Sequence, residues 1–166
     1  MANPPSFDLE AAHRFFSANC FNRAWDLMDS PDRSREDGLR MLALSQASIF
    51  HWMNRPDVTD KNLSVGYWQA SRVLALLGQP AAARWLADVS FSYSHGQAPF
   101  LRGYAYEGLA RAALGAGDVS QAREFIAQAR ALAAETTDAE DRALLEKDLA
   151  ALSQEADAAP PPAKDI

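Results

Sequence analysis

The amino-acid sequence predicts an all-α fold of about seven helices. Apolar residues recur at three- and four-residue steps along most of the chain, and no segment sustains the alternation typical of a strand. Prolines, glycines and capping residues divide this pattern into separate segments. With 166 residues, 48% of them hydrophobic, the chain has the length of one domain of roughly 100–200 residues. We expect that domain over residues 1–153, followed by a disordered tail at 154–166, where proline, alanine and charge predominate.

Capping residues and prolines delimit the first three helices. The first is expected over residues 7–29, with Ser6 as its N-cap and acidic residues in the opening turn, where the helix dipole favours anions. The second covers residues 34–55 and ends before Pro56, because proline disfavours a helical residue ahead of it. The third covers residues 59–77 and carries so little polar surface that we expect neighbouring helices to enclose it.

Prolines and glycines delimit the next two helices, and aspartates begin the last two. The expected ranges are residues 80–95, 99–115, 118–136 and 138–153. Proline at the start of the first two suits a first turn, where its missing N–H would have no helical partner. The last two ranges carry apolar residues at helical spacing, which predicts helices with one buried face.

Two stretches of the chain repeat each other at a distance of 39 residues. Gly78 and Gly117 each follow an apolar helix, and an alanine comes five residues later, at Ala83 and Ala122. A period of this length is typical of helical arrays, whose helix pairs bury their apolar faces only by stacking. We therefore expect a single helical-repeat domain, an α-solenoid of three stacked antiparallel helix pairs with the seventh helix as a cap.

The repeat resembles the tetratricopeptide repeat over residues 62–135. That unit is a helix, a Gly-Asp turn and an alanine-bearing second helix, and the later copy places Gly117-Asp118, Ala122, Ile126 and Ala129 at the consensus spacings. The earlier copy keeps Gly78 and Ala83 but has Ser71 where the consensus has glycine. The chain is similar more broadly to small uncharacterised bacterial tetratricopeptide-like proteins, which implies a fold but no activity.

The charge of the chain argues against a nucleic-acid or anionic membrane partner. Its net charge is −6, and lysine and arginine form no cluster that could bind a phosphate backbone. The excess acid lies in the second half: residues 1–78 hold 8 basic and 9 acidic side chains, whereas residues 79–166 hold 8 and 13. The beginning of the chain does not resemble a secretory signal and no stretch approaches the ~20 apolar residues of a membrane span, so we expect a cytoplasmic protein.

The sequence indicates neither a metal site nor a cofactor, and it shows no catalytic constellation. Its three histidines have no paired-ligand spacing, and its one cysteine, Cys20, lies among phenylalanines. We expect Cys20 to be a small core residue rather than a nucleophile.

The resemblance implies a groove lined by the first helix of each pair. Carried over to this chain, the groove positions are Val65, Trp68, Arg72, Tyr104, Glu107 and Arg111. Arg72 lies in an apolar helix, and because an unpaired buried charge is costly it needs Glu107 or an anionic ligand as a partner. The alternative is that Glu107 pairs with Arg111 at i,i+4 on a solvated face while Arg72 extends to water.

A second polar and aromatic cluster is expected near Pro56, formed by His51, Trp52, Asn54 and Asn62. His51 could act there as an acid, a base or a ligand. The alternative is a histidine that is hydrogen-bonded within a helix junction.

These features predict an adaptor or small scaffold that binds a protein or peptide partner in the groove. A small-molecule-binding protein or enzyme, using an aromatic pocket that contains Arg72, is the alternative. A homodimer that buries apolar groove surface is a third possibility.

Overall fold

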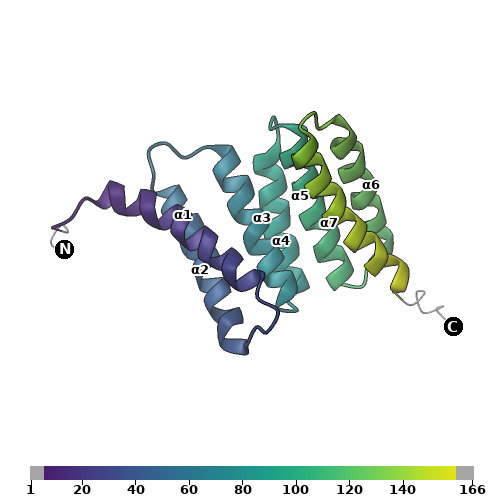
Figure 1. Ribbon diagram of the computed structural model, residues 1–166, viewed down its shortest axis with the longest axis horizontal. Coiled ribbons are helices and arrows are strands. Elements are labelled where there is room, and N and C mark those ends of the chain that lie inside the picture. The colour runs from purple at the N-terminus through teal and green to yellow at the C-terminus, as the bar shows by residue number, and fades with distance from the viewer. Residues whose placement is uncertain (1–5, 160–166) are drawn as a thin grey trace.

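The computed structural model describes residues 6–159, and this part of the chain contains seven helices and no strand (Figure 1). The helices are α1 (Leu9–Met28), α2 (Arg35–Met53), α3 (Asp60–Leu76), α4 (Pro80–Ser94), α5 (Pro99–Gly115), α6 (Val119–Glu135) and α7 (Ala139–Ala158). The all-α prediction is therefore confirmed. None of these described helices combines the length and the apolar character needed to cross a bilayer.

The helices form antiparallel pairs that stack side by side. The pairs are α1 with α2, α3 with α4, and α5 with α6, and α7 packs against both α5 and α6 at the end of the stack (Figure 1). The first helices of the second and third pairs, α3 and α5, contact each other, and α5 also contacts the terminal helix α7. The predicted solenoid-like stack with a seventh, terminal helix is thus observed.

Side-chain caps fix where most of the helices begin. Ser34 and Thr59 each form a reciprocal capping box with the residue three positions later, and Asp118 and Asp138 accept backbone N–H groups in the first turn of their helices. The expected cap at Ser6 is wrong. Asp8 caps α1 instead, because its carboxylate accepts the N–H of Ala11 at 3.0 Å and lies at the positive end of the helix dipole.

The two glycine turns have the same geometry. Gly78 and Gly117 have φ angles of 68° and 79°, in the left-handed region that glycine adopts without strain. In each turn the glycine N–H and the next N–H donate to carbonyls of the preceding helix: Gly78 to Ala75, Gln79 to Leu74, Gly117 to Leu114 and Asp118 to Ala113. The alanines five residues beyond the glycines are fully buried. The two bends are therefore equivalent, as the 39-residue offset predicts.

The expected disordered tail is too long at its beginning. Helix α7 continues to Ala158, five residues past the expected end at 153, and residues 160–166 lie outside the described part. Ala156 is buried in this last turn, and Arg123 of α6 donates to its carbonyl and pairs with Asp157 at 3.1 Å. Alanine, glutamate and glutamine are good helix formers, so packing against α6 extends the helix until the approach of Pro160.

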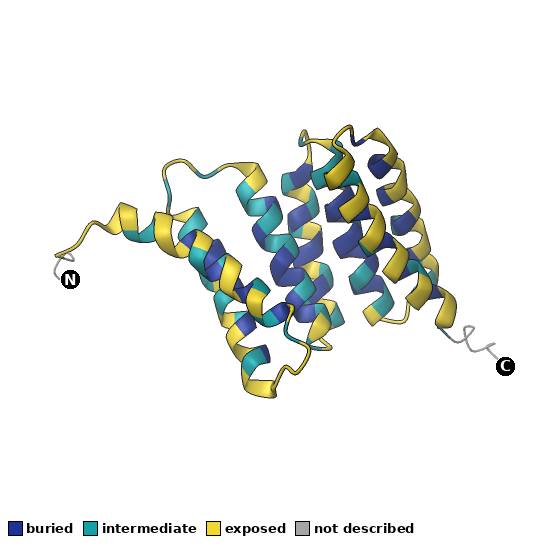
Figure 2. Ribbon diagram, viewed as in Figure 1, coloured by how far each residue is buried: buried dark blue, intermediate teal, exposed yellow. Residues whose placement is uncertain are grey.

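Buried residues concentrate on the middle helices of the stack, whereas the outer side of α7 is exposed (Figure 2). Small residues let the helices approach closely. Ser64 and Ser90, for example, exchange hydroxyl-to-carbonyl hydrogen bonds between α3 and α4 at 3.2 and 2.8 Å. Helix α3 packs against α2, α4 and α5, which agrees with the enclosure expected from its apolar sequence.

Candidate functional site

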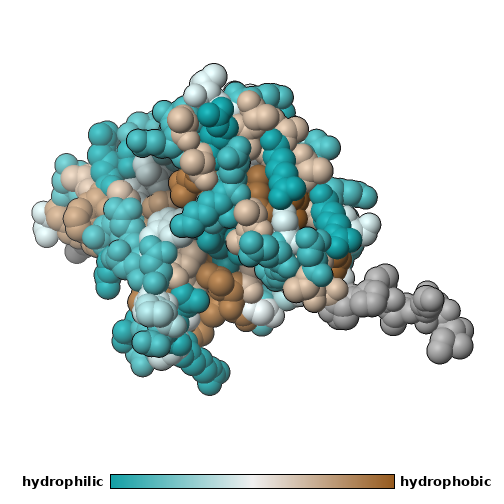
Figure 3. Space-filling view, turned by 45° about the vertical axis from the view of Figure 1, so that its right-hand side comes forward, coloured by the Kyte–Doolittle hydropathy of each residue, from teal (hydrophilic) through white to brown (hydrophobic). Residues whose placement is uncertain are grey.

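A pocket of about 460 Å³ opens on the face formed by α1, α3, α5 and α7, here called the odd-helix face. Its volume lies within the range of roughly 300–1,000 Å³ that is typical of ligand sites. Buried residues such as Ser64 and Ala105 form its floor, and the exposed residues Asp29, Leu144 and Lys147 line its mouth. Apolar surface on the molecule lies in recesses between ridges of hydrophilic side chains (Figure 3).

A row of four aromatic rings crosses this pocket. The ring centroids of Trp25 and Trp68 are 5.7 Å apart, those of Trp68 and Tyr104 are 4.7 Å apart, and those of Tyr104 and Phe100 are 5.0 Å apart. These separations are typical of favourable tilted and edge-to-face aromatic pairs. The row therefore joins α1, α3 and α5, which supply its rings, into one apolar wall.

The buried carboxylate of Glu107 lies behind the row of aromatic rings and supports it. Its side chain is fully buried, and it accepts hydrogen bonds from the indole N–H of Trp68 at 2.7 Å and from Nε of Arg111 at 3.0 Å. Nη2 of Arg111 donates to the same carboxylate, and Nη1 of Arg72 lies 3.5 Å from it. Because removing a lone carboxylate from water is costly, these cationic and N–H donors are what make the burial of Glu107 tolerable.

Asp148 of α7 completes the network. Its Oδ2 accepts a hydrogen bond from the Tyr104 hydroxyl and from Nη1 of Arg72, both at 3.2 Å. The two arginines and two carboxylates have a formal charge of zero together. Arg72 therefore needs no anionic ligand to balance it.

The network shifts the pKa values of two of its members. Burial, together with the nearby carboxylates of Asp148 and Glu107, raises the pKa of the Tyr104 hydroxyl far above its usual range. Burial alone would lower the pKa of Arg111, but Glu107 overcomes this effect and raises it. Both groups therefore keep their protons, so Tyr104 is a hydrogen-bond donor and not a base.

The structure brings together all six residues expected in the groove, but in two layers. Four of them line the pocket: Val65, Trp68, Arg72 and Tyr104. Glu107 and Arg111 are not among the lining residues; they belong to the network that supports it. The expected pairing of Arg72 with Glu107 is present. The alternative placed the Glu107–Arg111 pair on a solvated face, and this is wrong because the Glu107 side chain has no exposed surface.

Sequence reasoning missed several lining residues, chiefly Trp25, Phe100, Leu144, Lys147 and Asp148. Those from α1 and α7 come from segments outside the repeat copies, so the 39-residue offset could not place them. Asp148 pairs with Arg72 only because α7 packs against α5, a contact between segments far apart in the sequence.

The second expected cluster separates into two places. Nδ1 of His51 lies 2.8 Å from Nδ1 of His13, which joins α1 to α2. Trp52 lies beneath the Arg55 guanidinium at 3.9 Å, and with Asn62 it lines a separate hollow of about 180 Å³. Trp52 and Asn62 therefore share a hollow as expected, whereas His51 lies apart from it, in the junction between α1 and α2.

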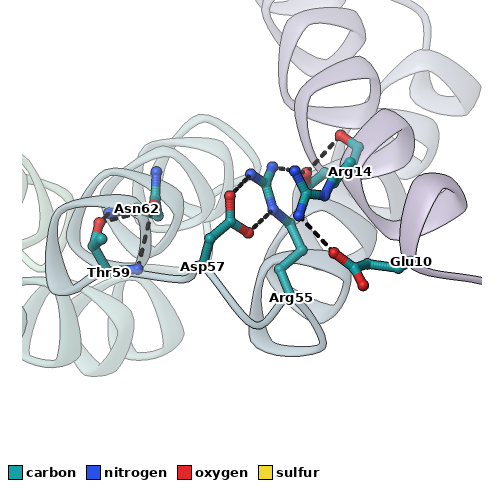
Figure 4. Close-up of polar contacts among 7 residues, drawn as sticks. Glu10, Arg14, Arg55, Asp57, Thr59 and Asn62 are labelled. Carbon is teal, nitrogen blue, oxygen red and sulfur yellow. Dashed lines mark hydrogen bonds and ion pairs between the residues drawn. The ribbon is translucent and has the colours of Figure 1, made fainter.

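Polar contacts around this junction fix the loop between α2 and α3 (Figure 4). Arg55 pairs with Asp57 through two contacts of 2.9 and 2.7 Å and donates to the Ser17 hydroxyl of α1 at 3.0 Å. The Arg55 guanidinium lowers the pKa of Asp57 to about 2. The side chain of Asn62, expected in a site, accepts the N–H of Thr59 in the cap of α3. This loop is therefore held by structural contacts.

The fold and the pocket define an all-helical stacked-pair protein with an aromatic ligand-sized hollow on its odd-helix face. Within the described residues, no group of three or more histidine, cysteine or acidic side chains is placed to hold a metal ion. No protein-family model matches the sequence, and a comparison with curated proteins also finds no match.

Proposed function

We propose that this chain is a cytoplasmic, tetratricopeptide-like adaptor that binds an apolar segment of a protein partner in the pocket on its odd-helix face. The observation that carries the proposal is the aromatic row of Trp25, Trp68, Tyr104 and Phe100, which lines a hollow open to solvent. Large aromatic side chains in a preformed pocket are typical anchor points of interfaces.

The charges around the pocket define the chemistry of the segment. Arg72 is already paired with Glu107 and Asp148, so an acidic ligand would have to displace these contacts. At the mouth, Asp29 and Lys147 carry opposite charges. The preferred segment therefore inserts an uncharged aromatic or aliphatic side chain, while its polar flanks meet the charged mouth.

The test is selection from a displayed library of random linear peptides, followed by binding measurements on single variants. Selected peptides should share an aromatic or aliphatic anchor. Leu144→Glu places a charge at the mouth of the pocket on an exposed helix position and should weaken binding at least about tenfold. Leu39→Glu is the matched control, because Leu39 is a similarly exposed leucine outside this pocket. Equal binding by both variants would refute the assignment of the pocket.

The pocket volume of about 460 Å³ favours a second candidate, a small-molecule-binding protein. The same charge balance selects an uncharged aromatic compound. A neutral dye such as N-phenylnaphthylamine distinguishes the two functions. Saturable binding of the dye that Leu144→Glu abolishes, in a chain that selects no peptide, would favour the small molecule.

A further inference from the structure

An exposed aromatic patch lies where α1 packs against α2, away from the pocket. It consists of His13, Phe15, Phe16, Phe50 and His51. Adjacent rings in this aromatic patch have centroids 5.0–6.2 Å apart, so the patch is continuous. Phe15, Phe16 and Phe50 are nevertheless 60%, 42% and 58% exposed.

The two ends of the stack differ in how much apolar surface they expose to solvent. Helix α7 buries Leu145, Leu149 and Leu152 inward and exposes mostly polar side chains outward, as a terminal helix of an array should. Of the ten large apolar side chains exposed in the described part, seven lie within residues 7–53. The N-terminal end of α1 also projects beyond the other helices (Figure 1). The α1–α2 end therefore carries apolar surface that no other described helix covers.

We propose that the aromatic patch is the interface of a symmetric homodimer, in which α1 and α2 of one copy pack against α1 and α2 of a second. A fully buried aromatic side chain covers about 150–250 Å², so the exposed parts of these three phenylalanines supply about 300 Å². That area is a little over a third of the area, about 800 Å² per partner, that a standard interface buries, so the three phenylalanines form the centre of the interface and surrounding residues supply the rest.

The distribution of charge favours a second copy as the occupant. Residues 1–78, which contain the patch, are nearly neutral, whereas residues 79–166 carry most of the net charge of −6. Contact through α1 and α2 therefore keeps the acidic halves of two copies far apart. Beside the patch, Arg14 pairs with Glu10 and Arg55 pairs with Asp57, so two identical patches meet without unbalanced like charges (Figure 4).

The proposed dimer leaves the pocket on the odd-helix face free. None of the five patch residues is among those that line the pocket. The dimer and the proposed peptide binding can therefore fail independently, and a dimer would present two pockets to one partner.

Sedimentation velocity and light scattering on the full chain, from about 1 μM to about 100 μM, test the proposal. The mass should rise with concentration from 18.1 kDa and level off at twice that value. Phe15→Glu and Phe50→Glu should each weaken dimerisation at least about tenfold while far-ultraviolet circular dichroism stays helical. Trp85→Glu is the matched control, because Trp85 is an aromatic residue that is 67% exposed on α4, and it should dimerise like the unmodified chain.

Each other outcome overturns the proposal. A mass that remains at 18.1 kDa over the whole range means that the patch does not bind a second copy. A mass that rises without levelling off indicates non-specific association. A dimer that survives both phenylalanine substitutions, or that Trp85→Glu also disrupts, uses another surface. If a phenylalanine variant loses its helical signal, the other one decides the result.

Discussion

Replacing Glu107 with glutamine preserves the size of the side chain but removes the negative charge that Arg72 and Arg111 share. Breaking a buried ion pair by removing one partner costs about 3–5 kcal/mol. The arginine side chains are each 18% exposed and Arg72 keeps Asp148, so we expect the lower end, a loss of about 3 kcal/mol. With a urea dependence of about 2 kcal/mol per molar, the unfolding midpoint should fall by about 1.5 M.

Two further variants separate the effect of charge from that of shape. Asp148→Asn removes a carboxylate whose side chain is 21% exposed and which leaves Arg72 paired with Glu107, so it should cost only about 1 kcal/mol. Replacing both Glu107 and Arg111 with leucine removes both charges, but it also leaves the Trp68 indole N–H without its acceptor, so it should recover only part of the lost stability.

Equilibrium urea unfolding followed by circular dichroism measures all of these values. If Glu107→Gln unfolds within about 0.5 kcal/mol of the unmodified chain, the carboxylate does not neutralise the two arginines and the described network is wrong.

Three other substitutions or conditions probe the fold. Gly117→Ala places a side chain at a φ of 79° and should cost about 1–2 kcal/mol in urea unfolding; an unchanged midpoint would contradict the left-handed turn. Burial and the neighbouring His13 lower the pKa of His51, so the folded chain resists protonation of this side chain. The free energy of unfolding should therefore fall as the pH drops below 6.5, the ordinary pKa of histidine. His51→Asn should flatten this dependence when unfolding is measured across pH. Gly103→Ala brings a methyl group to 2.4 Å from the buried Leu145 and should lower the free energy of unfolding by about 1–3 kcal/mol. An unchanged free energy of unfolding would mean that α5 and α7 are packed less closely than described.

The sequence predicted the helices well because their ends depend on local chemistry. Ser34, Thr59, Gly78 and Gly117 each determine a cap or a turn through contacts within a few residues. The C-terminal end of α7 could not be predicted in the same way, since it depends on Arg123 of another helix.

The residues of the candidate site could be predicted only where they occupy equivalent positions in the two copies of the repeat. Trp68 and Glu107 stand 39 residues apart at equivalent positions, and their hydrogen bond links one helix pair to the next. Trp25 and Asp148 obey no such relation, because α1 and α7 reach the pocket through packing over long sequence distances. The burial of Glu107 also could not be inferred, since its i,i+4 spacing to Arg111 is equally typical of a solvated pair.

The charge balance behind the aromatic row has a consequence for how a ligand is held. The charges of Arg72, Arg111, Glu107 and Asp148 sum to zero, so the field of this network falls off steeply with distance and dissolved ions have little long-range attraction to screen. The affinity of a molecule seated there should hardly change with ionic strength. A basic molecule attracted instead by the acidic C-terminal half would be released as salt is added.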